Sequence, residues 1–247
     1  MDLYNIVLYS LILVIVANTA KSMKRHSKNK KYIKVMQSYN DKDLFFENIN
    51  KFIEGQKDSE FIAKGYILKL YGLVYHDVYE EFDEVLEKID FKKLFTNNKG
   101  QVDYKKLDLN EDSYFYYCFY THFLTYEKNR VDLREKLKEK IKVDNELLKD
   151  HLIYNIYLNS FDVFETNDRN SYFEANYGGI SGRYCKQLIQ LYRVVSDSLF
   201  YLSLKKSNAE FDEIEYLKNE LKDFSTKSYG ERLMKSLGIY DEFKEVE

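Results

Sequence analysis

The stretch FIAKGYILKLYGLVY (residues 61–75) decides the class of fold that we expect for this chain. Its apolar and aromatic side chains would cover almost every side of a helix, which is typical of a helix that several neighbours bury. Two further stretches have the same character: SYFYYCFYTHFLTY (113–126) and LIQLYRVVSDSLFYLSL (188–204). We therefore expect three central helices, spaced widely along the chain.

A helix with a single apolar stripe is predicted after each central helix, because its apolar residues recur at spacings of three and four. The stripe residues are Tyr79, Phe82, Leu86 and Ile89 in the first case, Leu133, Leu137 and Ile141 in the second, and Phe211, Ile214, Leu217, Leu221 and Phe224 in the third. A buried helix, a short turn and a half-buried helix form the unit that stacked helical hairpins repeat.

The composition agrees with an all-α fold. The 247 residues are 45% hydrophobic and 32% charged and contain no proline, so the chain can bury a core and form long helices. No alternating strand pattern follows residue 40. We predict an all-α domain of stacked antiparallel hairpins over residues 41–247, arranged as a solenoid.

Helix ends can be placed at two positions. Asp41 and Asp58 are suited to cap the amino-terminal ends of helices that run to about Glu54 and Tyr75. Gly55 lies between these helices and is suited to end the first of them.

At this point the chain resembles tetratricopeptide-type repeat proteins. Gly72 is followed by Tyr75, and then by Tyr79-Glu80-Glu81, as in that family's first-helix Gly-x-x-Tyr and the aromatic and acidic start of its second helix. The similarity covers about one repeat. It implies an architecture, a right-handed stack of hairpins, and it assigns no binding residues.

The chain departs from the family pattern in three respects. Phe82 and Ile89 occupy positions where the family has small residues, and the family's closing proline is absent. The corresponding stripe positions Phe82, Val131 and Phe211 are 49 and 80 residues apart, which suggests a repeat with a period near forty, but an irregular one.

The amino-terminal segment contains no charge from residue 3 to residue 20. A helix of this length spans about 27 Å, close to the hydrocarbon thickness of a bilayer. Only Asp2 precedes the apolar run, and residues 16–20 (VANTA) make a poor cleavage site. We predict an uncleaved transmembrane helix at residues 1–20, with a cleaved signal peptide and a buried core helix as the alternatives.

A basic run follows directly and contains no acidic residue before Asp41. Its members are Lys21, Lys24, Arg25, Lys28, Lys30, Lys31 and Lys34. Because basic flanks stay on the cytoplasmic side, we predict a juxtamembrane segment at 21–40 in a single-pass protein of the cell membrane. Its amino terminus would lie outside and its carboxy-terminal domain in the cytoplasm. Contact with anionic lipid headgroups is an additional use of the run.

Nucleic acid is not an expected partner. The part of the chain after the run contains 31 of the 38 basic residues and 40 of the 41 acidic residues. This part is therefore negatively charged and repels polyanions.

No cysteine or histidine pattern indicates a metal site or a nucleophile. Cys118 and Cys185 lie far apart in apolar surroundings and are interpreted as small buried residues, which suits a reducing compartment. His122, between Tyr120 and Phe123, is expected to be a packed, hydrogen-bonded imidazole. His76 and Glu80 are interpreted as a surface contact. The remaining histidines, His26 and His151, have no paired spacing either.

Polar segments interrupt the helical pattern. Residues 96–112 are interpreted as an insertion loop between hairpins, with a domain boundary as the alternative, and a second break covers 165–183. In the latter, NYGGISGRYC (176–185) is expected to be a turn that needs Gly178 and Gly179, with an anion-binding nest near Arg183 as the alternative. A further buried helix is expected over 144–159.

These patterns lead to a function hypothesis without catalytic, cofactor-binding or metal-ligating residues. We predict a membrane-anchored interaction or scaffold module whose partners are the lipid bilayer and a protein or peptide. The alternative is a small-ligand sensor or enzyme with a pocket near 113–126 and 176–185. A third possibility is a helical protein that is secreted after signal cleavage.

Overall fold

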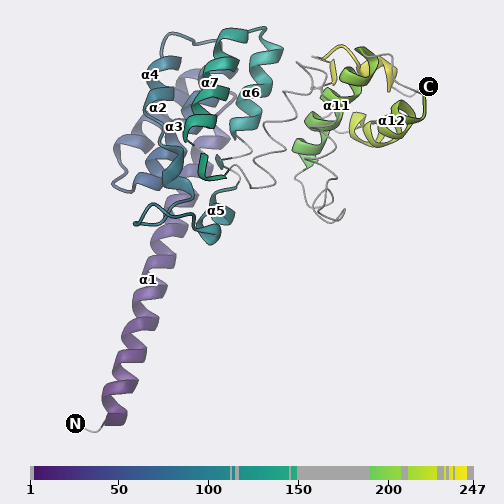
Figure 1. Ribbon diagram of the computed structural model, residues 1–247. Coiled ribbons are helices and arrows are strands. Elements are labelled where there is room, and N and C mark those ends of the chain that lie inside the picture. Colours follow the sequence, from purple (N-terminus) through teal and green to yellow (C-terminus); the bar gives the residue numbers. More distant parts are fainter. Residues whose placement is uncertain are drawn as a thin grey trace.

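The computed structural model describes residues 3–111, 113–114, 117–144, 146–148, 190–206, 211–226, 231, 234–235 and 237–243 (Figure 1). Within these ranges the chain is helical and no strand joins a sheet, since Thr96 and Val102 form only an isolated antiparallel bridge. The prediction of an all-α fold is confirmed.

The helices follow one another in the order α1 (Leu3–Gln37), α2 (Lys42–Glu54), α3 (Ser59–Tyr75), α4 (Phe82–Glu87), the 3-10 helix η1 (Phe91–Leu94), α5 (Tyr104–Glu111), α6 (Tyr117–Glu127), α7 (Val131–Asp144), η3 (Glu146–Leu148), α11 (Gln190–Lys206), α12 (Phe211–Ser225) and η4 (Tyr240–Glu242).

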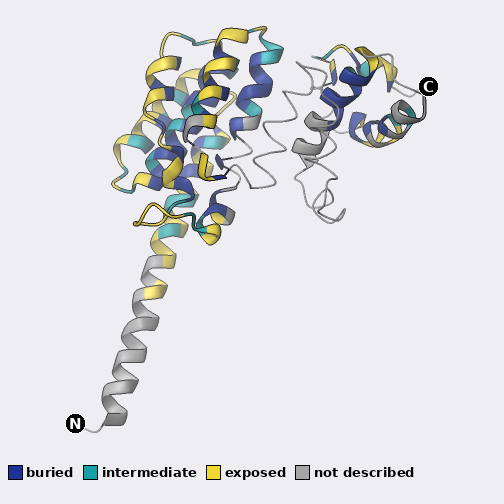
Figure 2. Cartoon of the chain, viewed as in Figure 1, coloured by how far each residue is buried: buried dark blue, intermediate teal, exposed yellow. Residues whose placement is uncertain are grey.

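Helix α3 is the centre of the amino-terminal group of helices. It contacts α1, α2, α4, η1 and α6 (Figure 1). Residues on all its sides are buried, among them Leu73 and Val74, which have no exposed surface (Figure 2). The prediction that residues 61–75 form a helix buried all round is therefore confirmed.

The predicted pairing of a central helix with a striped helix is found for the second and third pairs. Helices α6 and α7 contact each other, as do α11 and α12. The described stripe residues Leu133, Leu137, Ile141, Leu217, Leu221 and Phe224 are all buried. The side chains of Phe211 and Ile214 lie outside the described residues.

The first striped helix is shorter than predicted. Phe82, Leu86 and Ile89 are buried, but the α-helix covers only Phe82–Glu87, and the chain continues through η1. Tyr79 precedes this helix and is half-buried.

The capping predictions are confirmed. The carboxylate of Asp41 accepts a hydrogen bond from the backbone N–H of Leu44 over 3.1 Å, and that of Asp58 accepts one from Glu60 over 3.1 Å. Helix α2 ends before Gly55, as expected.

The polar stretch 96–112 contains more structure than an insertion loop. Residues 104–111 form α5, where Leu107 and Asn110 are buried. Asp103 accepts a hydrogen bond from the N–H of Lys106 over 3.2 Å, which is an amino-terminal cap that the sequence analysis missed. The predicted helix 144–159 and the break 165–183 lie almost wholly outside the described residues.

Helices α3 and α6 end in the same backbone conformation. Asp77 and Asn129 follow these helices with φ angles of 58° and 54°. In each case the N–H of the next residue donates to the carbonyl group five positions earlier, over 2.9 Å after α3 and 2.8 Å after α6. The two hairpin turns lie side by side, because Lys128 Nζ is 2.7 Å from Asp77 Oδ2 and the Arg130 guanidinium is 4.0 Å from the centre of the Tyr79 ring.

The structure contradicts the prediction of a single-pass location in the cell membrane with the domain in the cytoplasm. Among the described residues, which exclude the side chains of residues 3–17, no helix combines the length and the apolar character that crossing a membrane requires. Helix α1 continues for 35 residues, through both the predicted anchor 1–20 and most of the predicted juxtamembrane segment 21–40. Tyr32 and Val35 are 7% and 4% exposed and belong to the hydrophobic core, so this part of α1 is bound to the helical domain.

Helices α2 and α3 approach closely because α3 has glycine at two positions on the facing side. A Cβ atom at Gly72 would lie 2.1 Å from Cε1 of Phe45, and one at Gly65 would lie 2.6 Å from Cγ1 of Ile53. Neither distance is compatible with a real side chain, so the contact requires both glycines.

We expect Gly72→Ala to lower the free energy of unfolding by about 1–3 kcal/mol, because the added methyl group overlaps the Phe45 ring. Urea denaturation measures the loss. Phe45→Leu alone should also cost stability, but the double variant should lose less than the sum of the two single losses. Strictly additive losses would contradict the contact.

Candidate functional site

The basic run of α1 divides into residues that the domain uses and residues that it leaves exposed. Arg25 Nη2 lies 2.8 Å from Glu60 Oε1, and Lys28 Nζ lies 2.6 Å from Asp58 Oδ2. Lys24, Lys30, Lys31 and Lys34 are exposed and have no ion-pair partner within the described part of the chain. The side chain of Lys21 lies outside the described residues.

The paired cations surround Phe61, which is 1% exposed. Lys28 Nζ and Lys64 Nζ are 4.9 Å and 5.2 Å from the centre of its ring. Glu60, itself buried, lies between Arg25 and Lys64, whose Nζ is 3.9 Å from the Glu60 carboxylate. The buried ammonium group of Lys64 needs a nearby acid, and Glu60 supplies it. Because Glu60 also pairs with Arg25, this cluster holds α1 on α3.

The pKa of Asp58 reflects this pairing. Burial raises it, but the hydrogen bond and the charge of Lys28 outweigh burial and hold the pKa of the Asp58 carboxyl below its usual value. Asp58 therefore both caps α3 and binds α1.

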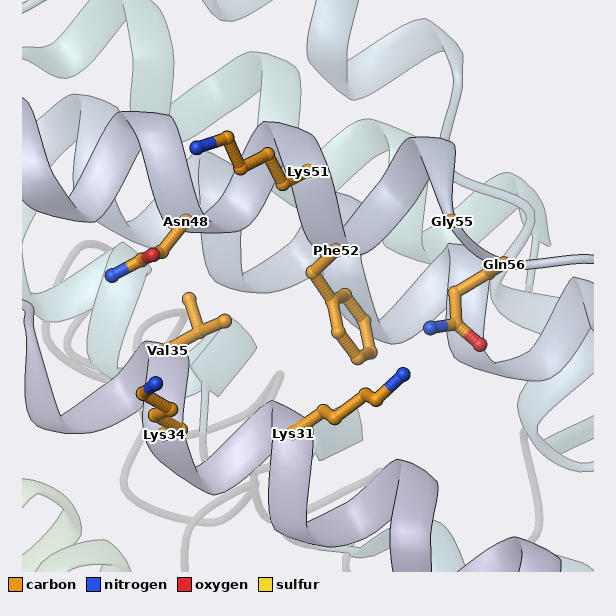
Figure 3. Close-up of a pocket in the computed structure, with 8 residues that line it drawn as sticks. All are labelled: Lys31, Lys34, Val35, Asn48, Lys51, Phe52, Gly55 and Gln56. Atoms are coloured by element: carbon orange, nitrogen blue, oxygen red, sulfur yellow. The ribbon is translucent and has the colours of Figure 1, made fainter.

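A recess of about 200 Å³ lies between α1 and α2 (Figure 3). Its lining residues are Lys31, Lys34, Val35, Asn48, Lys51, Phe52, Gly55 and Gln56. Figure 3 shows Lys31 and Lys34 extending from α1, with the Phe52 ring pointing from α2 toward Lys31. Val35 and Phe52 are buried, so the recess has an apolar base and a rim of ammonium and carboxamide groups.

The recess carries an excess of positive charge. Lys51 forms an ion pair with Glu47 on the same helix, but both side chains are more than half exposed, so the pair is weak and easily exchanged. Lys31 and Lys34 have no ion pair among the described residues. Asn48 donates to the hydroxyl group of Ser38 over 3.3 Å, which orients its carboxamide. Chemically, the site is suited to accept a carboxylate or another small anion.

The predicted repeat-motif residues are structural in this fold. Gly72 allows the contact with Phe45 described above. The Tyr75 hydroxyl donates to Asn40 Oδ1 over 3.2 Å, and the Tyr79 hydroxyl donates to Asp77 Oδ1 over 2.5 Å. Burial, together with the Asp77 hydrogen bond, raises the pKa of Tyr79 to about 12.

The other candidate groups within the described part of the chain are not gathered into a site. Cys118 is buried, and burial raises the pKa of its thiol, which makes it unreactive. His76 Nε2 lies 2.7 Å from the carbonyl oxygen of Tyr39, and it forms no ion pair with Glu80, which is also a described residue. Within the described ranges, no three His, Cys, Asp or Glu side chains are placed to hold a metal ion.

The alternative pocket near 113–126 and 176–185 is described only in part. Residues 176–185, with Gly178, Gly179, Arg183 and Cys185, lie outside the described residues, as does His151. In α6, residues 121–125 are all buried, and His122 is packed as predicted.

Sequence reasoning missed the recess because no motif marks it. The sequence pattern predicts a membrane-surface role for Lys31 and Lys34, and no motif includes Asn48, Lys51 or Gln56. A usable signal was present: Tyr32, Val35 and Met36 form an apolar stripe with helical spacing inside the basic run.

Comparisons with known protein families, with curated proteins and with solved structures found no match. The resemblance to tetratricopeptide-type repeats stays a prediction.

The division of the basic run can be tested with a matched pair of variants. We expect Arg25→Gln to lower the free energy of unfolding by about 1–3 kcal/mol, because buried Glu60 loses its nearest cation. Lys24→Gln should change it by about 0.5 kcal/mol or less. Equal effects of the two substitutions in urea denaturation would show that Arg25 is not part of the structural cluster.

His122 provides a pH-dependent test. Burial, reinforced by the charges of Arg134 and Lys138, lowers the pKa of its imidazole well below the usual value. As the pH falls below about 6.5, the unfolded chain binds a proton that the folded chain does not, so stability should decrease by about 1.4 kcal/mol per pH unit. In urea titrations, His122→Gln should remove this part of the slope; an unchanged slope would mean that His122 is not responsible.

Proposed function

We propose that the chain is a non-catalytic interaction module, built from stacked helical hairpins, that binds a protein or peptide partner. The observation that carries the proposal is a set of exposed lysines on α1 that have no ion-pair partner among the described residues; two of them, Lys31 and Lys34, line the recess. We call Lys24, Lys30, Lys31 and Lys34 the lysine row.

The lysine row lowers the stability of the protein when no partner is bound. Lys31 and Lys34 are three positions apart and Lys30 and Lys34 are four, and like charges at these spacings on a helix repel each other by a few tenths of a kcal/mol. An acidic partner removes this repulsion. The row therefore favours association with a surface of opposite charge.

The hairpins support the stacked arrangement. The turns after α3 and α6 share one cap conformation and are joined by the Lys128–Asp77 ion pair, as expected when equivalent units are placed next to each other. Aromatic contacts between the central helices agree with this, since the Tyr71 ring lies 5.5 Å from the ring of Tyr117 and 5.3 Å from that of Tyr120. Stacked hairpins present extended surfaces that bind peptides or helices.

Zero-length cross-linking of the full chain in a native cell extract tests the proposal, because a carbodiimide joins ammonium groups to carboxylates in direct contact. We expect one partner protein to be joined to the lysine row and, once purified, to form a complex with the chain. Lys92 and Lys99 are exposed lysines outside α1 and serve as internal controls.

Two results would contradict the proposal. Equal cross-linking of all these lysines to many proteins would indicate random collision. A purified chain that forms no complex, but whose melting temperature rises with a small metabolite, would favour the small-ligand alternative.

A further inference from the structure

We propose that the recess between α1 and α2 receives an acidic side chain from an Asp- or Glu-rich segment of the partner, while the lysine row binds the neighbouring carboxylates. This inference rests on the proposed function and specifies the chemistry of the partner.

The size of the recess favours a side chain over a separate small molecule. Its volume is about 200 Å³, whereas pockets for drug-sized ligands and cofactors measure about 300–1,000 Å³. Since a water molecule occupies about 30 Å³ in the liquid, the recess has room for one carboxylate-bearing side chain and a few waters.

The chemistry of the rim matches a carboxylate. Lys31 and Lys34 supply ammonium donors that no acid within the described residues neutralises, and Lys51 can exchange its weak pair with Glu47. Asn48 and Gln56 also line the recess and supply carboxamide groups, which Figure 3 shows on either side of the Phe52 ring. The buried base formed by Val35 and Phe52 limits hydration beneath the ion pair, which strengthens it.

The direction of helix α2 indicates that the partner segment carries several acidic residues and not one. Helix α2 ends at Glu54, next to the recess, so its last carbonyl groups place partial negative charge there. This charge weakens the attraction for a single anion. A segment whose further carboxylates reach Lys24 and Lys30 along α1 compensates for that loss.

The charge distribution of the chain also favours a peptide over a nucleic acid as the partner. After the basic run the chain has more acidic than basic residues, 40 against 31, so a long polyanion is repelled beyond α1. A short acidic segment, in contrast, places its negative charge only beside the lysines of α1. We therefore assign the recess to a peptide.

The test uses the full chain and a fluorescent peptide of alternating Glu and Ala, with the Gln and Ala peptide as its matched control. Fluorescence anisotropy should show binding of the Glu peptide only, weakening as salt is added. Lys31→Gln combined with Lys34→Gln should weaken binding about tenfold, since two ion pairs are lost. Lys31→Arg combined with Lys34→Arg should retain it.

Lys92→Gln combined with Lys99→Gln removes the same charge elsewhere and should leave binding unchanged. The inference is overturned if this control weakens binding equally, if the Glu peptide does not bind, or if a single-stranded oligonucleotide binds more tightly with the same dependence on Lys31 and Lys34. If the partner found by cross-linking still binds the Lys31→Gln and Lys34→Gln variant fully, the recess assignment fails while the interaction function stands.

Discussion

The close approach of α2 to α3 at two glycines is the constraint on which the rest of the structure depends. A Cβ atom at Gly65 would lie 3.3 Å from Cδ1 of Phe52 and would also overlap Ile53. The lack of a side chain at Gly65 therefore determines where the Phe52 ring lies. That ring in turn lies 5.7 Å from the ring of Tyr32 on α1. The glycines thus position α1 through one intermediate side chain, and with it the opening of the recess.

Electrostatics then divides the basic run of α1 between structure and surface. Arg25 and Lys28 point to acids at the start of α3, where Asp58 also caps the helix. Helical geometry turns Lys24, Lys30, Lys31 and Lys34 to other sides, where the domain offers no acid among the described residues. A single run of cations therefore has two physical roles, and the exposed part is the one available to a partner.

The local features of the fold were predictable from sequence, because each has a local cause. Carboxylates at Asp41 and Asp58 cap the helices that follow them, and Gly55 follows the end of α2. The all-round apolar pattern of residues 61–75 indicated burial on every side. These predictions needed no knowledge of the tertiary structure.

The position of α1 and the recess were not predictable in this way. An uncharged stretch followed by cations suggests a membrane anchor, and the ion pairs that bind α1 to α3 join residues 30 to 35 positions apart, such as Lys28 with Asp58. Only the assembled helices show that Tyr32 and Val35 are buried and that Lys31 and Lys34 face α2 across a recess. The most direct measurement of this account is amide hydrogen exchange of the full chain, followed over residues 26–37. The account predicts that these amides exchange as slowly as those of α3; exchange at the rate of a free helix would contradict it.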